Sequence, residues 1–136
     1  MYPPELVKPM KVDLVSAGFT ELTTAAAVDE ALKQEGTVLL VVNSVCGCAA
    51  ANARPAAKQS LNNDKKPQAL FTVFAGVDAD AVERAREYMV PFPPSSPAIA
   101  LFKDGELVHM LERHHIEGRP AEMISENLTE AYNEFC

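Results

Sequence analysis

The stretch SPAIALFKDGELVHML (Ser96–Leu111) holds two short apolar segments around a tight turn. Ala98–Phe102 and Glu106–Leu111 have the length and composition of strands, and the Lys-Asp-Gly sequence that joins them is typical of a β-hairpin. Pro97 comes directly before the first strand, which makes the Ser96–Pro97 peptide bond a candidate for the cis form. An antiparallel hairpin is therefore predicted late in the chain.

Strands and helices alternate on the N-terminal side of this hairpin. Thr37–Asn43 and Ala69–Gly76 are largely apolar runs, the pattern of strands that are buried on both faces of a sheet. Phe19–Leu22 alternates apolar and polar residues and predicts a further short strand. Helices are predicted at Glu5–Ser16, between a cap at Thr23 or Thr24 and a stop at Gly36, at Ala49–Ser60 with a kink at Pro55, at Asp78–Met89 and at Ala121–Phe135.

This order of elements implies a parallel core sheet with right-handed crossovers, because each strand is followed by a helix. The hairpin and a last helix are then added. Few folds end in this way, and the thioredoxin fold is one of them. We therefore expect the α/β class and a thioredoxin-like fold, as a single domain over residues 1–136 with a central mixed sheet of four to five strands flanked by helices.

The composition argues against two kinds of partner. The chain carries 12 basic and 19 acidic residues, so its net charge is −7. Nucleic acids and anionic membranes attract basic surfaces, so we expect neither as a partner. The start of the chain does not have the pattern of a secretory signal, and the longest apolar run, Val38–Val42, is far shorter than the roughly 20 residues of a membrane span. We expect a cytoplasmic protein that needs no cofactor.

Two of the three cysteines, Cys46 and Cys48, are separated by a single residue. In a reducing compartment such a pair is more often redox-active or metal-binding than structural. Cys46 follows a predicted strand and precedes a predicted helix, where unpaired N–H groups and the helix dipole favour a thiolate. Its pKa should therefore fall below the free value of about 8.5. No basic residue is adjacent in sequence, and we expect Arg54 to lie too far away to help.

The C-x-C spacing predicts a disulfide ring smaller than that of a C-x-x-C pair. Gly47 is the residue best able to absorb the strain. Since a strained disulfide is easier to reduce, the pair should be more oxidising than thioredoxin, whose potential is about −270 mV. In a thioredoxin-like fold the Ser96–Pro97 loop would lie beside Cys46, and its backbone could pair with an extended client. We therefore take Gly47, Ser96 and Pro97 as candidate substrate-binding residues.

Four segments resemble the bacilliredoxins, which are thioredoxin-like proteins with a C-G-C site: VVNSVCGCAAANARPAA, TVFAGVD, PPSSPAIALFKDGELVHMLERHHIEG and NLTEAYNEFC. The resemblance covers nearly the whole chain. It implies a thiol–disulfide oxidoreductase that removes bacillithiol from protein mixed disulfides, and also disulfide isomerase activity. Cys46 would attack the mixed disulfide, Cys48 would resolve the intermediate, and Pro97 would be the cis-proline. Bacillithiol and bacillithiolated client proteins would be the partners.

Three features depart from ordinary thioredoxins: the C-G-C site, the absence of tryptophan, and Asn43 where thioredoxins have a buried aspartate. One alternative is a metal-binding C-x-C protein that handles zinc or copper, with nitrogen ligands from His109, His114 and His115. Another is an interaction module with an inert Cys46. Cys136 is either a tail thiol without a role or a third partner that captures Cys46 or links two chains.

Overall fold

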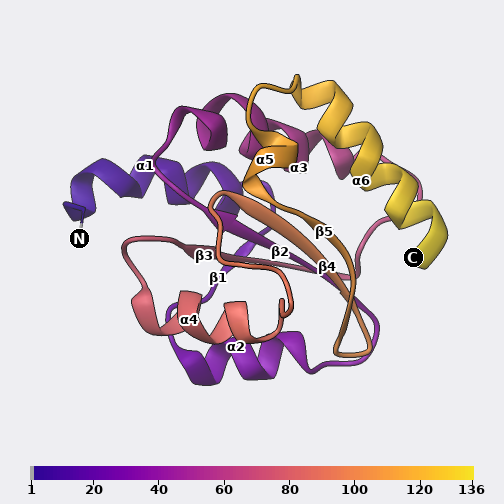
Figure 1. Ribbon diagram of the computed structural model, residues 1–136, viewed down its shortest axis with the longest axis horizontal. Coiled ribbons are helices and arrows are strands. Elements are labelled where there is room, and N and C mark those ends of the chain that lie inside the picture. The colour runs from indigo at the N-terminus through magenta and orange to yellow at the C-terminus, as the bar shows by residue number, and fades with distance from the viewer. Residues whose placement is uncertain (1) are drawn as a thin grey trace.

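The computed structural model describes residues 2–136 and places five strands in one mixed sheet of order β1-β3-β2-β4-β5 (Figure 1). β1, β3 and β2 are parallel, whereas β4 is antiparallel to β2 and β5 is antiparallel to β4. The predicted parallel core with a terminal hairpin is therefore confirmed. The strands are β1 (Thr20–Glu21), β2 (Thr37–Asn43), β3 (Ala69–Phe74), β4 (Ala98–Lys103) and β5 (Glu106–Leu111).

Helices cover both faces of the sheet. On one face α1, α3 and α6 pack together, and on the other face α2 packs against α4 (Figure 1). No helix within residues 2–136 has both the length and the apolar character needed to cross a bilayer. The helices are α1 (Pro4–Val15), α2 (Ala25–Leu32), the π-helix η1 (Ala49–Ala53), α3 (Arg54–Ser60), α4 (Ala79–Glu87), α5 (Arg113–Ile116) and α6 (Ala121–Phe135).

The central strand β2 is buried along its whole length, as its continuous apolar sequence predicts. Because side chains alternate along a strand, Leu39 and Val41 enter the core under α3 and α6, whereas Val38, Leu40 and Val42 enter the core under α2 and α4. Packing on both faces fixes the position of the strand. The carboxyl end of β2 is therefore a rigid base for the residues that follow it.

The hairpin turn and the segment before β2 are joined. Asp104 and Gly105 both have positive φ, 52° and 83°, which suits a two-residue turn between twisted strands. The Asp104 carboxylate accepts a hydrogen bond of 2.8 Å from the N–H of Gly36. Gly36 therefore belongs to this turn contact, and the prediction that it ends the preceding helix is wrong, because α2 already ends at Leu32.

The predicted helix Ala49–Ser60 is divided. Its first part is the π-helix η1, in which the N–H of Arg54 donates to the carbonyl of Ala49, five residues earlier. Pro55 follows at once and lacks an N–H, and its ring would crowd the carbonyl of residue 51 in a regular helix. The predicted kink therefore takes the form of a π-bulge on the N-terminal side of the proline.

A short helix follows β5, where the sequence analysis predicted no helix. The side chain of Glu112 accepts a hydrogen bond from the third residue of α5, His115, and the His115 ring accepts one from the N–H of Glu112. This reciprocal cap stabilises a single helical turn at Arg113–Ile116. His114 and His115 therefore lie in a helix. The sequence analysis missed this helix because it did not recognise Glu112 and His115 as a capping pair.

Candidate functional site

Cys46 lies between the end of β2 and the start of a helix. Helical backbone begins at residue 47, and the carbonyl of Cys46 accepts hydrogen bonds from the N–H groups of Ala49 and Ala50 at 3.0 and 3.3 Å. Cys46 is thus the last residue before the first helical turn. Unpaired N–H groups are found at such a position, together with the positive end of the helix dipole. The position suits an anionic sulfur.

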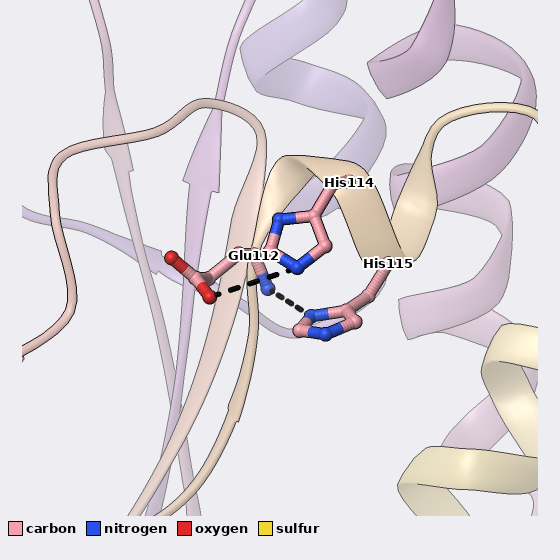
Figure 2. A group of neighbouring side chains, drawn as sticks. All are labelled: Glu112, His114 and His115. Carbon is pink, nitrogen blue, oxygen red and sulfur yellow. Dashed lines mark hydrogen bonds and ion pairs between the residues drawn. The ribbon is translucent and has the colours of Figure 1, made fainter.

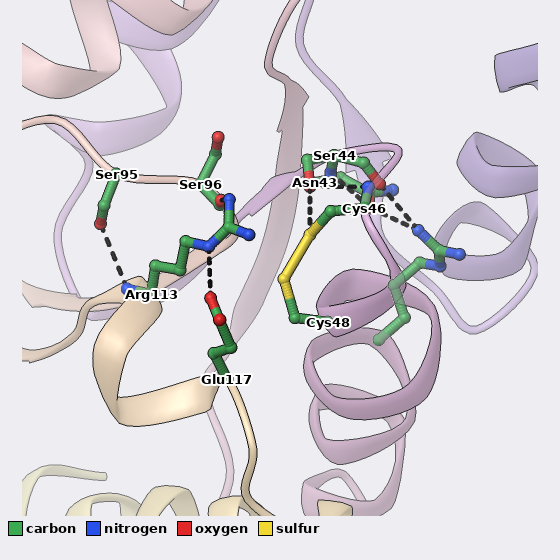
Figure 3. The surroundings of a disulfide bond; sticks show 9 residues. Asn43, Ser44, Cys46, Cys48, Ser95, Ser96, Arg113 and Glu117 are labelled. Atoms are coloured by element: carbon green, nitrogen blue, oxygen red, sulfur yellow. Dashed lines mark hydrogen bonds and ion pairs between the residues drawn. A yellow bond between two sulfur atoms is a disulfide. The ribbon is translucent and has the colours of Figure 1, made fainter.

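Cys46 and Cys48 form a disulfide, and their Cα atoms are 5.4 Å apart (Figure 3). The two residues differ in exposure. Cys46 is partly exposed, whereas Cys48 is only 9% exposed. Gly47 is exposed between them, has no positive φ, and a Cβ atom there would meet nothing within 4 Å. The open space beside Gly47 therefore lets an incoming molecule approach Cys46, whereas Cys48 is largely shielded from it.

The loop before β4 lies across from the disulfide (Figure 3). The Ser96–Pro97 peptide bond is cis, and so is Val90–Pro91, which the sequence analysis did not single out. Pro97 is buried and Ser96 is partly exposed. The structure thus brings Ser96 to the same side of the molecule as the cysteine pair.

Arg113 of α5 contacts this loop and was not recognised in the sequence. Its Nη1 donates to the Ser96 carbonyl at 3.2 Å, its backbone N–H donates to Ser95 Oγ at 3.2 Å, and its Nε pairs with Glu117 at 2.7 Å (Figure 3). The pairing register of the hairpin could have indicated this contact from the sequence. Ile99 pairs with Leu111, so two residues further along each strand Pro97 and Arg113 are brought opposite each other.

Arg54, which we expected to lie too far away to help, is connected to the site through Asn43 and Ser44 and makes no direct contact with Cys46. Its side chain is buried, and Nη1 donates to Asn43 Oδ1 at 2.9 Å and to the Ser44 carbonyl at 3.1 Å. Ser44 Oγ in turn donates to Cys46 Sγ at 3.3 Å. A basic residue in an otherwise alanine-rich helix was the sequence signal, because a charge on a buried helix needs a partner.

The side chains that lie close enough to share a metal ion differ from the predicted set, which combined the cysteine pair with three histidines. Among residues 2–136, one group of three has ligand atoms close enough for a shared ion, namely Glu112, His114 and His115, and it contains neither cysteine (Figure 2). His115 Nδ1 accepts the N–H of Glu112 at 3.0 Å, which places the proton of the neutral ring on Nε2. Burial, followed by the charge of His114, lowers the pKa of His115. The Glu112–His115 pair serves as the cap of α5.

The remaining histidine and cysteine, His109 and Cys136, lie away from the Cys46–Cys48 disulfide. His109 Nε2 is hydrogen-bonded to Asn127 Oδ1 at 2.6 Å. Cys136 lies beside Thr37, at the opposite end of β2 from Cys46, and burial of its thiol raises its pKa. Six residue steps along a strand separate the two ends by roughly 20 Å. The prediction that Cys136 captures Cys46 within one folded chain is therefore wrong. A link between two chains through Cys136 stays a prediction.

Solved thioredoxin structures share the fold of this chain. A mutant thioredoxin from Halobacterium salinarum is similar with a TM-score of 0.58 and 16% identity, over 88% of this chain and 95% of that one. Thioredoxin from Fasciola hepatica is similar with a TM-score of 0.57 and 18% identity, over 87% of this chain and 100% of that one. The fold and the cysteine pair that follows the end of β2 place the chain in the class of thioredoxin-fold proteins with a paired-cysteine site.

Within that class the chain belongs to the bacilliredoxin family. A family model described as disulphide isomerase matches residues 2–136. A bacilliredoxin of Cytophaga hutchinsonii is 61% identical over 98% of this chain and 99% of its own length. A bacilliredoxin of Bacillus cereus is 53% identical over 97% of this chain and 92% of its own length. The fold and the family inferred from the sequence are therefore confirmed.

Proposed function

We propose that the protein removes bacillithiol from client proteins that carry it as a mixed disulfide. One observation carries the proposal: a partly exposed cysteine at a helix start is paired with a nearly buried one. Because Cys46 is partly exposed, a bulky protein disulfide can approach it, whereas Cys48 is shielded. The name of the family supports the choice of bacillithiol as the thiol that is removed.

The reaction consists of two exchange steps. The thiolate of Cys46 attacks the bacillithiol sulfur of the mixed disulfide, which forms a Cys46–bacillithiol disulfide and releases the client thiolate. The thiolate of Cys48 then attacks Cys46 Sγ, which releases bacillithiol and forms the Cys46–Cys48 disulfide. The mixed disulfide gains two electrons and is split into the client thiol and bacillithiol, while the protein loses two electrons as its two thiols become a disulfide. The oxidised pair in the structure corresponds to the end of this sequence, and a further thiol reductant must restore it.

The candidate substrate-binding residues have separate roles in this proposal. Gly47 leaves the approach to Cys46 open, since a Cβ atom there would meet nothing. Ser96 and Pro97 lie opposite and offer backbone atoms to an extended client segment, as in strand addition. Because the structure has the Ser96 carbonyl bonded to Arg113, a client that uses this carbonyl must share it or displace the guanidinium.

Disulfide isomerase activity is a second candidate, supported by the description of the matching family model. The same nucleophile would attack a wrongly paired disulfide within a client. The client thiolate that is released could then attack another client disulfide or the bond to Cys46. Cys48 would free the protein from clients that fail to rearrange, by the same attack on Cys46 Sγ.

Mass spectrometry tests the main proposal on a client protein with one bacillithiolated cysteine. The reduced protein should free the client and end as the internal disulfide. A Cys48→Ala variant should free the client and keep bacillithiol on Cys46, whereas a Cys46→Ala variant should leave the client modified. Release by Cys46→Ala would overturn the assignment of the nucleophile. Equal rates with a glutathionylated client would overturn the specificity for bacillithiol but not the exchange chemistry.

A further inference from the structure

A chain of polar contacts leads from Cys46 to a buried cation. Ser44 Oγ donates to Cys46 Sγ at 3.3 Å and accepts from the N–H of Cys46 at 3.4 Å. Asn43 Oδ1 accepts from the N–H of Ser44 at 2.9 Å and from Arg54 Nη1 at 2.9 Å. Arg54 Nη1 also donates to the Ser44 carbonyl at 3.1 Å. The guanidinium thus holds the two residues that lead into the cysteine turn.

The charge of Arg54 is only partly balanced. Its Nε pairs with Asp13 of α1 at 3.2 Å, but the same carboxylate also pairs with Lys58 at 2.6 Å. Two cations thus share one anion. The side chain of Asp13 is 35% exposed and that of Arg54 is 7% exposed, so water screens the carboxylate more than the guanidinium. A net positive charge is left beneath the site.

Other charged groups near Cys46 are balanced or turned to other partners. Across the site, Arg113 of α5 pairs with Glu117. Arg86 of α4 donates to the Ser95 carbonyl, and burial lowers its pKa. On α1, Lys11 is held between Glu21 and Asp78 at 2.5 and 3.1 Å. Arg54 is therefore the cation with a continuous hydrogen-bonded connection to the sulfur.

We propose that Arg54 is a positioning residue of the reduced site, which orients Ser44 Oγ toward Cys46 and supplies fixed positive charge that favours the thiolate there. The inference rests on the proposed function, in which Cys46 is the nucleophile. A thiolate is a much stronger hydrogen-bond acceptor than a disulfide sulfur, so the Ser44 contact gains strength on reduction. Asp13 opposes the effect, because it withdraws part of the charge of Arg54.

The test measures the rate of iodoacetamide alkylation of Cys46 against pH in the reduced protein. An Arg54→Met variant should raise the apparent pKa of Cys46 by about one unit, which is a roughly tenfold loss of thiolate below both values. Asp13→Asn should shift it in the opposite direction. Lys58→Met is the matched control, since it removes a cation from the same carboxylate without touching Asn43 or Ser44, and it should shift the apparent pKa less than Arg54→Met.

If Arg54 had a purely structural role, Arg54→Met would lower the melting temperature, but Arg54→Met and Asp13→Asn would not shift the apparent pKa of Cys46 in opposite directions. Arg54→Lys should restore part of the shift, because it keeps the charge but loses the planar fork. If Arg54→Met does not fold, Ser44→Ala carries the test and should also raise the apparent pKa. Equal shifts in Arg54→Met and Lys58→Met, or no shift in Ser44→Ala, would overturn the inference. A wild-type Cys46 that titrates like a free thiol would instead count against the proposed function.

Discussion

At the scale of single residues, the two sulfurs divide the work because the chain exposes them differently. Cys46 is partly exposed at the start of a helix, and Cys48 is 9% exposed one residue beyond Gly47. The glycine is not required by the backbone, since its φ is not positive and its surroundings are empty. Its value therefore lies in access to the disulfide or in closure of the small ring.

A Gly47→Ala variant separates these two roles. The fold should tolerate it, with an unfolding free energy within about 1 kcal/mol of wild type, because alanine suits a helix better than glycine. Release of a bacillithiolated protein client should slow by about tenfold, since a methyl group displaces the approaching disulfide. Reduction of the Cys46–Cys48 bond by dithiothreitol, a small reductant, is the control and should change little. Equal slowing of both reactions would assign Gly47 to ring closure.

The sequence predicted the place of Cys46 but not the direction of the Arg54 side chain, although a lone basic residue in an alanine-rich helix was a signal that it needed a partner. Cys46 follows a strand and precedes a helix, which can be recognised from apolar runs and alanines. The direction of Arg54 depends on the π-bulge at Ala49–Ala53. One extra residue in a helix turns every later side chain by roughly 100°, so an ordinary helical projection places Arg54 on the wrong face.

At the scale of elements, α3 and α6 are joined by a buried pair of hydroxyl groups. Ser60 Oγ donates to the Ala57 carbonyl at 2.7 Å and lies 2.9 Å from the Tyr132 hydroxyl. Because the proton of Ser60 is engaged with Ala57, the Tyr132 hydroxyl is the donor in the second bond. Burial raises the pKa of Tyr132, so the phenol keeps its proton there.

This arrangement predicts unequal costs for two substitutions. Ser60→Ala leaves the buried Tyr132 hydroxyl without a partner and should cost about 1–3 kcal/mol of unfolding free energy. Tyr132→Phe removes the hydroxyl itself while Ser60 keeps its bond to Ala57, so it should cost about 1 kcal/mol or less. Urea unfolding of both variants and of the double variant measures the difference. A larger loss in Tyr132→Phe than in Ser60→Ala would contradict the donor assignment.

Elements with a strong apolar pattern were predicted well, and so was the cap of α2 at Thr24, but the short helix capped by Glu112 was not. β2 has the predicted bounds, Thr37–Asn43, because buried strands have continuous apolar sequences. The short α5 depends on the reciprocal bonds of Glu112 and His115, and no apolar periodicity marks it. This helix positions Arg113 against the Ser96 loop, so the contact of Arg113 with the candidate site was missed with it.

At the scale of the whole molecule, β2 places the three cysteines at its two ends. Cys46 and Cys48 follow the carboxyl end of the strand, and Cys136 lies beside Thr37 at the amino end. The order of strands and helices predicted this sheet, because a parallel core followed by a hairpin is compatible with few topologies. The sequence predicted the bounds of α6, Ala121–Phe135, but the place of Cys136 also depends on how this helix packs along the sheet, which the sequence does not define.

The most direct test of the central claim compares the three thiols in one sample. The fully reduced protein is alkylated briefly with iodoacetamide at about pH 6.5, two units below the free thiol value, and each cysteine is quantified by peptide mapping. Cys46 should react at least about tenfold faster than Cys48, which is shielded, and than Cys136, which is exposed but whose thiol pKa is raised by partial burial. Equal labelling of the three, or faster labelling of Cys48, would contradict the account.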